Sequence, residues 1–406
     1  MKRILCLLAA ALTLLAGGCT KTSLLQGPPR QPRLTGRHPD PRTGATDAPG
    51  PHLYLTAVVF ADGYDWKTDS LPAARGAEIL VLKDGEEMLR VPAGESLGPD
   101  RHRVQGGHLY QDGPEGQETV LRRDGKAVLR FGGQAALKGF LAAGDTLHSL
   151  WQFQEGGIAY RVGRELLYED PSGMAIGADE APERPWGSFS RDGNRLYYSY
   201  YVPVRSGENV LKEYRTMQGA LPFITLPAGN VFEVGDVRVQ EGVVYRVERR
   251  TAGASSLSLV QGKDVRILPA GEGESASAGR LFFSGGRVLA RYRLTGPEGS
   301  RLVVSDGDSL VFAPQGRVRE FCLDGDDAVW LLSEGGGDIG AICRKGKEPL
   351  IPGSGFTLFS GRCLQLRDGR CFVALTGRDG RHHCLCVDDT VIPFSFNGYF
   401  SSVEWE

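Results

Sequence analysis

A short hairpin pattern recurs along this chain and constrains its fold more than any other feature. The clearest copy is residues 302–312, LVVSDGDSLVF, in which an Asp-Gly pair separates two apolar runs. Asp-Gly between alternating apolar residues is a strong local signal for a β-hairpin, because a two-residue turn needs positive φ angles that glycine adopts without steric cost. The sequence therefore predicts an all-β chain of antiparallel strands after residue 52.

Residues 1–18 have the features of a signal peptide. Lys2 and Arg3 precede a twelve-residue apolar core, residues 4–15. As a helix this core would rise only about 18 Å, which is too short for the roughly 30 Å hydrocarbon layer of a membrane. The small residues before Cys19 resemble a bacterial lipobox, with Ala16 where leucine is usual. We expect cleavage before Cys19 and lipid attachment to its thiol, which would hold the chain at a membrane; the alternative is ordinary secretory cleavage with Cys19 unmodified.

Residues 19–52 are predicted to be a flexible tether that follows the lipidated cysteine. The segment consists largely of Pro, Gly, Thr and Arg, so it has too few apolar side chains to form a core. Its charged residues are Lys21, Arg30, Arg33, Arg37 and Arg42 against Asp40 and Asp47, a net charge of +3. A positive tether is suited to a surface of anionic lipid headgroups.

The overall charge argues against nucleic-acid binding. Loss of residues 1–18 removes Lys2 and Arg3, which leaves 45 of the 47 basic residues against 49 acidic ones, a net charge of −4. The sequence contains no strongly basic stripe. Because neutralisation of phosphates supplies most of the affinity for nucleic acids, we expect no nucleic-acid partner.

Turn residues recur with a period of about 43 residues and divide the rest of the chain into repeats. One series is Gly85, Gly125, Gly163, Gly219, Gly262, Gly307 and Gly346, with Asp388-Asp389 in the eighth place. A second series interleaves with it: Gly107, Gly144, Gly193, Gly242, Gly286, Gly325 and Gly369. Each repeat therefore has room for four antiparallel strands, which are the unit of a β-propeller blade. Tandem β-sandwiches are the alternative, but they would not keep one period along the chain.

The two ends of the repeat array predict how the ring closes. Residues 53–91 lack an inner strand, whereas residues 399–404 form a spare strand after the eighth repeat. If the spare strand fills the missing place, closure pairs the two chain ends and removes an exposed sheet edge. Residues 53–406 are thus predicted to be an eight-bladed β-propeller with four-stranded antiparallel blades, closed by the C-terminal strand. Seven blades is the alternative if the repeat with the 56-residue interval between Gly163 and Gly219 is irregular.

The connections between predicted strands differ on the two faces of such a ring. Tight turns belong to one face, and the connections between second and third strands and between blades belong to the other, which we call the long-loop face. The longest segments are all of the second kind: residues 61–76, 92–100, 170–186, 203–209 and 270–278. Because loops on a rigid scaffold often carry binding residues, the long-loop face is the candidate functional surface.

The candidate ligand-binding residues on this face are aromatic and acidic. They are Tyr64, Asp65, Trp66 and Asp69 in the first long segment and Trp186 at the end of segment 170–186. Tyrosine and tryptophan offer a large contact area with few rotamers to freeze, and the carboxylates can hold a sugar hydroxyl, a cation or a basic peptide. The alternative is that the aromatic residues only fix the long segments to their own blades.

Six cysteines follow Cys19, all in the last two repeats. They are Cys322, Cys343, Cys363, Cys371, Cys384 and Cys386. An exported protein permits disulfides, and buried reduced thiols are the alternative. The run of residues 382–386, HHCLC, near Cys371 raises zinc as a third alternative, but CxC on a strand lacks the turn found in CxxC sites, so no metal site is predicted.

The sequence contains no recognisable catalytic motif. Its seven histidines are scattered, and it has neither a GxSxG elbow nor an HExxH helix nor a phosphate-binding glycine loop. We therefore predict no catalytic residues and no cofactor. The alternative function is a carbohydrate-active or other cell-envelope enzyme whose site is assembled from several blades.

The lipobox, the tether and about eight blade-sized repeats resemble bacterial lipoprotein β-propellers, including the outer-membrane assembly factor with quinone-enzyme-type repeats. Those repeats carry an ALDxxTGxxxW-like motif, whereas this chain repeats hhxxDGxxhh (h, apolar), so the resemblance covers architecture alone. The resemblance implies that the protein acts as a scaffold. We therefore expect a lipid-anchored protein of the bacterial cell envelope that faces the periplasm, with surface exposure as the alternative, and that binds a protein or glycan partner through the long-loop face.

Overall fold

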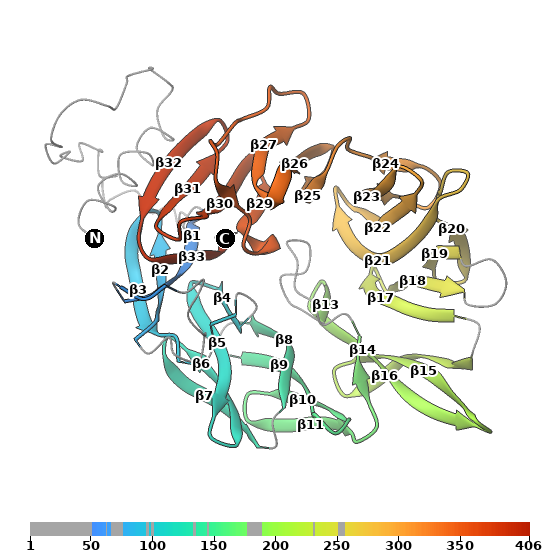
Figure 1. Cartoon of the computed structure of the whole chain (residues 1–406). Coiled ribbons are helices and arrows are strands. Elements are labelled where there is room, and N and C mark those ends of the chain that lie inside the picture. Colours follow the sequence, from blue (N-terminus) through green and yellow to red (C-terminus); the bar gives the residue numbers. More distant parts are fainter. Residues whose placement is uncertain are drawn as a thin grey trace, which may run out of the picture.

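The computed structural model describes residues 51–406 except for 62, 66–75, 95–96, 99–100, 133–134, 144–145, 177–188, 230–231 and 251–255. The described residues form eight antiparallel sheets arranged as blades around one axis (Figure 1). This confirms the predicted eight-bladed β-propeller and excludes the seven-bladed alternative. The helical elements described in full are two short 3-10 turns, Gly335–Gly337 and Gly361–Cys363. The predicted signal peptide and Cys19 lie outside the described residues.

Each blade is named here in ring order, with its strands given from the axis outward. Blade 1 contains β33 (Gly398–Trp405), β1 (Leu53–Val59), β2 (Glu78–Lys83) and β3 (Glu86–Pro92). Blade 2 contains β4 (His102–Gln105), β5 (His108–Glu115), β6 (Glu118–Arg123) and β7 (Lys126–Gly132). Blade 3 contains β8 (Ala136–Ala143), β9 (Thr146–Gln152), β10 (Ile158–Val162) and β11 (Glu165–Asp170). In blade 4, β12 (Met174–Ala175) and β13 (Phe189–Asp192) both pair with β14 (Arg195–Ser206), which is followed by β15 (Asn209–Gln218) and β16 (Leu221–Gly229).

The second half of the ring repeats this plan with two variations. Blade 5 contains β17 (Phe232–Gln240), β18 (Val243–Arg250), β19 (Ser256–Gln261) and β20 (Asp264–Ile267). Blade 6 contains β21 (Ser275–Ser284), β22 (Arg287–Gly296), β23 (Gly299–Ser305) and β24 (Leu310–Phe312). Blade 7 contains β25 (Val318–Asp324), β26 (Asp327–Ser333) and β27 (Ile339–Arg344), and a single bridge from Ile342 to Leu350 takes the place of the fourth strand. In blade 8, β28 (Phe356–Thr357) and β29 (Leu364–Arg367) pair with β30 (Arg370–Gly377), followed by β31 (His382–Val387) and β32 (Thr390–Ser395).

The last strand of the chain closes the ring, as predicted. β33 pairs antiparallel with β1, so that Tyr54 lies opposite Glu404 and Val59 lies opposite Gly398. The two backbones approach closely at the start of β33, because a methyl group added at Gly398 would lie 1.9 Å from the Val58 carbonyl oxygen. Closure therefore covers the inner edge of β1, on which another chain could otherwise pair.

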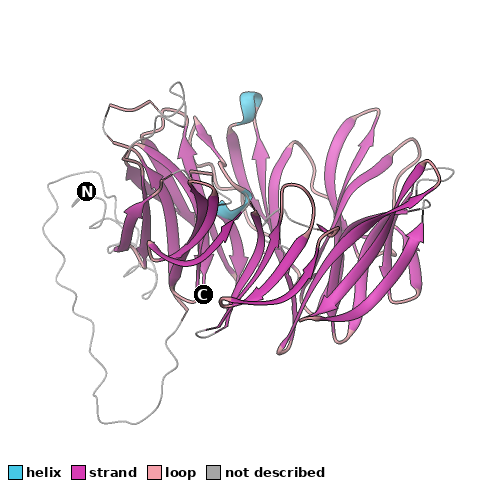
Figure 2. Cartoon of the chain, turned by 90° about the horizontal axis from the view of Figure 1, so that it is seen from below, coloured by secondary structure: helices cyan, strands magenta, loops and turns pink. Residues whose placement is uncertain are grey.

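The tight turns lie on one face, as the glycine series predicts. Asp84 and Gly85, between β2 and β3, have φ angles of 49° and 91°, and these two positive values define the I′ type of hairpin turn. Every described member of both series lies in a turn or short connection of this face, which we call the tight-turn face; Gly144 lies outside the described residues. The C-terminus lies toward this face, the lower rim in Figure 2.

The turn within residues 302–312 differs from the prediction. β23 ends at Ser305 and β24 begins at Leu310, so four residues rather than two connect the strands. The Asp306 carboxylate accepts hydrogen bonds from the backbone nitrogens of Asp308 and Ser309, both at 3.0 Å. These local bonds satisfy the backbone without a two-residue turn, and an aspartate side chain can therefore override the hairpin signal of the Asp-Gly pair.

Side chains near the ends of the inner strands bond neighbouring blades to one another at several junctions of the ring. The acceptors and donors on the tight-turn face are Gln105 Oε1 with Ala142 N (2.9 Å), Asp192 Oδ2 with Gly242 N (2.8 Å), Ser284 Oγ with Gly325 N (2.8 Å), Asp324 Oδ2 with Asp368 N (2.9 Å) and Glu406 Oε2 with Gly107 N (3.3 Å). Each bond satisfies a backbone N–H that the sheet ladder leaves without a partner. The ring is therefore stabilised by polar contacts near its axis as well as by the apolar core.

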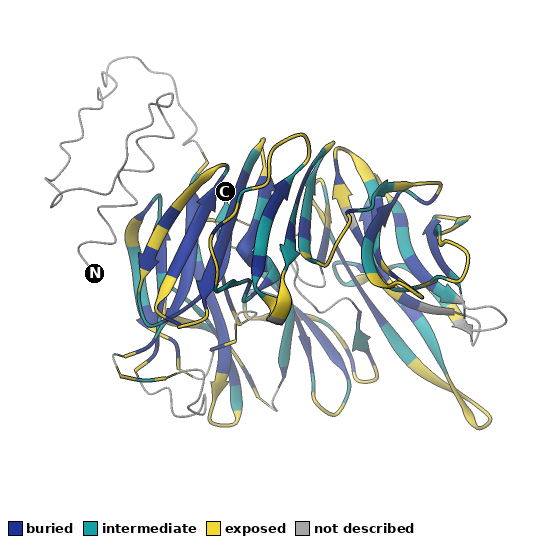
Figure 3. Cartoon of the chain, turned by 45° about the horizontal axis from the view of Figure 1, so that its top comes forward, coloured by how far each residue is buried: buried dark blue, intermediate teal, exposed yellow. Residues whose placement is uncertain are grey.

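The apolar core lies between neighbouring blades, where buried faces of adjacent sheets meet (Figure 3). Aromatic rings fill much of it: Phe131 of blade 2 stacks on Trp151 of blade 3 with centroids 4.6 Å apart, and Tyr160 of blade 3 stacks on Tyr198 of blade 4 at 5.0 Å. The six cysteines are free thiols, and all but Cys322 are buried. Burial raises the pKa of the Cys363 thiol to about 12, so this group is protonated and unreactive at neutral pH.

Candidate functional site

The long-loop face contains a projecting hairpin where the sequence predicts a loop over residues 203–209. β14 and β15 continue through this segment, Arg205 lies opposite Val210, and only residues 207–208 form the turn. The prediction of a long loop is therefore wrong at this position. The valines favour extended backbone, and the two-residue turn allows both strands to extend past the rest of their sheet.

This hairpin, residues 202–211, which we call the arm, has no strand beside it in the described part of the chain. The pairing of β12 with β14 ends at Tyr201, and the pairing of β16 with β15 ends at Lys212. Val210 is 64% exposed and Val204 is 36% exposed, and they lie on opposite faces of the arm. The tip of the arm stands clear of the ring at the lower right of Figure 3.

Tyr64 fixes the first long segment to the closing strand region. Its ring lies 5.0 Å from that of Phe60, and Asn397 Nδ2 donates hydrogen bonds to the carbonyl oxygens of Ala61 (2.9 Å) and Tyr64 (2.7 Å). This half-buried position supports the alternative in which Tyr64 anchors the loop. Asp65, the next residue, is exposed on the same face. The other predicted residues of this segment, Trp66 and Asp69, lie outside the described residues.

The second long segment begins at a buried polar cluster in blades 3 and 4. Tyr200 Oη donates to Asp170 Oδ2 at 3.1 Å, and Arg215 Nη1 donates to the same oxygen at 2.9 Å. The hydroxyl of Tyr168 lies 2.6 Å from that of Tyr200. Burial, with a further contribution from Tyr168, raises the pKa of Tyr200, so its phenol stays protonated and serves as a donor to the carboxylate. Asp170 therefore holds the start of the segment in place.

The inner strand of blade 4 consists of two short pieces. Ile176 N donates to Ser199 O at 3.1 Å just after β12, and Phe189 of β13 lies opposite Tyr198, so β12 and β13 pair in succession with the same strand, β14. The sequence could not predict this, because β12 is too short to be recognised as a strand. Trp186 lies outside the described residues.

The described starts of the two long segments lie apart in the ring. Tyr64 follows β1 of blade 1 and Asp170 ends β11 of blade 3, so that blade 2 lies between them (Figure 1). A single small ligand therefore does not contact both places. A partner that used both would need a broad surface, as proteins have.

The described residues contain no group of three or more His, Cys, Asp or Glu side chains placed to hold a metal ion. The buried contact of His102 Nε2 with Ser401 Oγ, at 2.7 Å, joins a histidine to a hydroxyl, but Ser401 is fully buried and closed to a substrate. The sequence gives no signal for this pair, because its members come from opposite ends of the domain.

None of the helical segments described here has the length and apolar character required to cross a bilayer.

These features define a β-propeller with one plain and one elaborated face. No protein-family model matches the chain, and no curated protein is similar to it in sequence. Solved structures that share the general fold include an initiation factor described as eukaryotic, with 11% identity over 81% of this chain and 85% of that one and a TM-score of 0.49. The dihydro-heme d1 dehydrogenase NirN has 13% identity over 86% and 74% of the two chains and a TM-score of 0.48. BamB from Moraxella catarrhalis has 11% identity over 80% and 95% and a TM-score of 0.39.

Proposed function

We propose that the protein is a lipid-anchored β-propeller of the bacterial cell envelope that binds a protein partner through its long-loop face. The observation that carries this proposal is the arm, which presents Val204 and Val210 to solvent on that face. Exposed aliphatic side chains on a rigid projection suit the apolar centre of a protein interface. They offer a glycan neither hydrogen bonds nor an aromatic face, and so a protein is favoured over the glycan alternative.

The position of the two chain ends also favours the long-loop face as the binding surface. Glu406 N donates to His52 O at 3.0 Å, and both residues adjoin the tight-turn face where β1 begins. A tether attached to Cys19 therefore enters the propeller from the tight-turn side. A flexible chain of this length has a root-mean-square span of about 30 Å. The long-loop face is then on the side away from the attachment point and free to meet a partner.

The closed ring supports a scaffold role. Bonds between inner strands and the pairing of β33 with β1 hold the blades in one arrangement before any partner binds. A preorganised surface loses little conformational entropy on association. We propose that several long-loop elements contribute together, because a standard interface covers about 800 Å² on each partner.

The proposal is tested by crosslinked recovery of partners from membranes with two matched variants. Val210→Asp introduces a charge on the arm, and Leu221→Asp introduces the same charge at the 72% exposed Leu221, which lies in the same blade at the tight-turn face. We expect Val210→Asp to abolish recovery of a specific protein and Leu221→Asp to leave it unchanged, with both variants retaining the thermal midpoint of the parent. Equal recovery with both, or equal loss, contradicts the assigned face. Recovery of glycan alone contradicts a protein partner, and turnover of that glycan would establish the enzymatic alternative.

A further inference from the structure

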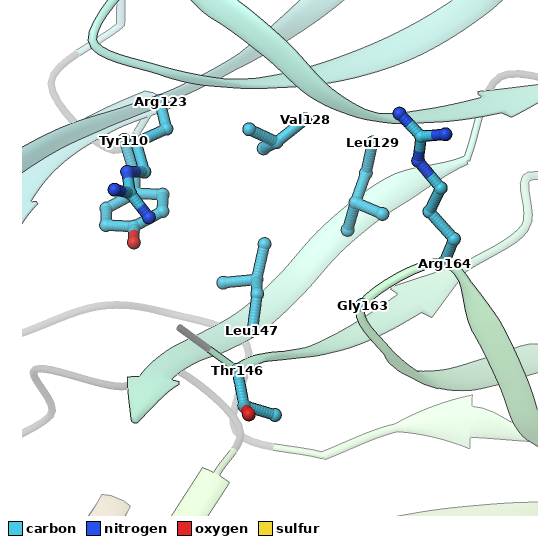
Figure 4. A pocket seen from close by; sticks show the side chains of 8 residues that line it. All are labelled: Tyr110, Arg123, Val128, Leu129, Thr146, Leu147, Gly163 and Arg164. Atoms are coloured by element: carbon cyan, nitrogen blue, oxygen red, sulfur yellow. The ribbon is translucent and has the colours of Figure 1, made fainter. Parts of the chain in front are cut away.

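A cavity of about 150 Å³ opens on the tight-turn face between blades 2 and 3 (Figure 4). Its walls come from the ends of β5, β6 and β7 in blade 2 and from β9 and the turn before β11 in blade 3. The side chains that matter for its chemistry are Tyr110, Arg123, Val128, Leu129, Leu147 and Arg164. This cavity lies on the face opposite the arm and is independent of the function proposed above.

The middle of the cavity is apolar. Val128 and Leu129 of β7 lie across from Leu147 of β9, and all three belong to the apolar cluster between the two blades. An apolar cavity of this volume is large enough to hold a benzene-sized ring. The body of a ligand that fits here is therefore an aromatic ring or a branched alkyl group.

The two ends of the cavity are cationic. Figure 4 shows Arg123 beside Tyr110 at one end and Arg164 at the other. Burial raises the pKa of the Tyr110 phenol while the neighbouring Arg123 opposes that rise, and the phenol is protonated at neutral pH. Tyr110 can therefore donate a hydrogen bond next to a guanidinium group, which is a favourable setting for an anionic oxygen.

Both guanidinium groups lack a carboxylate partner among the described residues, in contrast to their neighbours. Arg122, adjacent to Arg123, forms an ion pair with Glu115, and Arg130 lies 3.2 Å from Glu118. The carboxylate of Asp124, which follows Arg123, already accepts from His108 Nδ1 (2.7 Å) and Leu109 N (3.0 Å). Two arginines without a carboxylate partner among the described residues, at the two ends of one cavity, point to a negatively charged ligand.

We propose that this cavity binds a small carboxylate with an apolar body, whose ring or alkyl group lies over Val128, Leu129 and Leu147 and whose carboxylate contacts an arginine. Arginine suits this task because its planar group can donate two parallel hydrogen bonds to a carboxylate. Two sources supply such a group: a free carboxylic acid, or the C-terminal residue of a peptide with an apolar side chain.

The test measures binding of four probes by NMR titration of the intact protein. Phenylacetate stands for the free acid and N-acetylphenylalanine for a peptide C-terminus, and the corresponding neutral amides are their controls. We expect the acids to bind and the amides to bind at least about tenfold more weakly, since hydrogen bonds to charged groups contribute about 1.5–3 kcal/mol and about 1.4 kcal/mol corresponds to tenfold. The acid that binds more tightly identifies whether the carboxylate comes from a free acid or from a peptide C-terminus.

Four variants locate the binding. Arg123→Gln and Arg164→Gln each remove the guanidinium group at one end of the cavity, and removal of whichever group contacts the carboxylate should weaken binding of the acids about tenfold. Arg195→Gln removes an exposed arginine on the same face of blade 4 and should have no effect. Val128→Phe should fill the cavity and prevent binding of acids and amides alike, with the thermal midpoint reporting that the protein remains folded. Equal binding of acids and amides, an unaltered affinity in both Arg123→Gln and Arg164→Gln, or no binding of either acid at millimolar concentration would overturn the proposal.

Discussion

The side chains of His102 and Ser401 are separated by 299 residues in the chain, yet His102 Nε2 lies 2.7 Å from Ser401 Oγ in the buried wall of the ring. Ser401 also contacts Thr56 O at 3.2 Å, which links the closing strand to blades 1 and 2. Arg362 of blade 8 donates to His102 O and to Glu404 Oε1, both at 2.7 Å. This ion pair lies in the interior, where burial raises the pKa of the Glu404 carboxyl and the neighbouring Arg362 opposes that rise. β33 is thus bonded to three blades.

The first prediction concerns this closure. Deletion of residues 399–406 should lower the thermal midpoint of the whole ring, because it reopens an edge in blade 1 and removes the contacts with blades 2 and 8. Hydrogen exchange should show lost protection in all blades. A truncated protein with an unchanged midpoint would contradict the role given to β33.

A point substitution tests the same closure without shortening the chain. Gly398→Ala should destabilise the protein by about 3 kcal/mol, the upper range for an overpacked site, because the new methyl group meets the Val58 carbonyl oxygen. Gly132→Ala is the matched control, since a methyl group there has open space around it. Urea unfolding measures the free energy of unfolding of both variants. Equal stability of the two variants would show that β33 can shift without cost.

The third prediction concerns pH. Burial lowers the pKa of His148, whose Nδ1 lies 2.8 Å from Tyr160 Oη, and burial raises the pKa of Tyr160 to about 12, so both groups are neutral at pH 7. The folded state binds the His148 proton more weakly than the unfolded state does, so this contribution to stability is complete above about pH 6.5 and is lost as the pH falls below that value. NMR should show His148 titrating below pH 6.5. His148→Gln should reduce the fall in unfolding free energy between pH 7 and pH 5, and titration at or above 6.5 would refute the assignment.

The fourth prediction concerns the aromatic candidates on the long-loop face. If Trp66 or Trp186 is an anchor for the partner, its replacement by alanine should weaken association by about 2 kcal/mol. Charge reversal at Asp65 or Asp69 should mainly change the association rate and its salt dependence. Surface plasmon resonance with the recovered partner measures both effects. Unaltered kinetics in all four variants would remove these residues from the interface.

The fifth prediction concerns the anchor. Cys19→Ala should release the protein into the soluble fraction or leave it with an uncleaved leader, because the lipid acceptor is lost. Cys6→Ser is the control, since Cys6 is removed with the signal peptide. Fractionation and lipid labelling that are the same for the Cys19→Ala variant and the parent would count against lipidation.

The sequence by itself determined the fold class, the number of blades and the closing strand. Turn geometry depends on the sterics of a few adjacent residues, so positions such as Gly85 can be assigned without knowledge of their surroundings. The period of the turns then sets the blade, and the spare strand at residues 399–404 accounts for the strand missing before residue 53.

Only the tertiary structure decided which side chains meet. Where neighbouring strands end and how adjacent blades pack decide four features: the arm at residues 202–211, the pairing of both β12 and β13 with β14, the His102–Ser401 contact and the cavity beside Arg164. Residue spacing along the chain carries no information about such contacts, because ring closure brings together residues hundreds of positions apart. Turns are encoded locally in this protein, whereas its candidate sites are created by the geometry of the assembled ring.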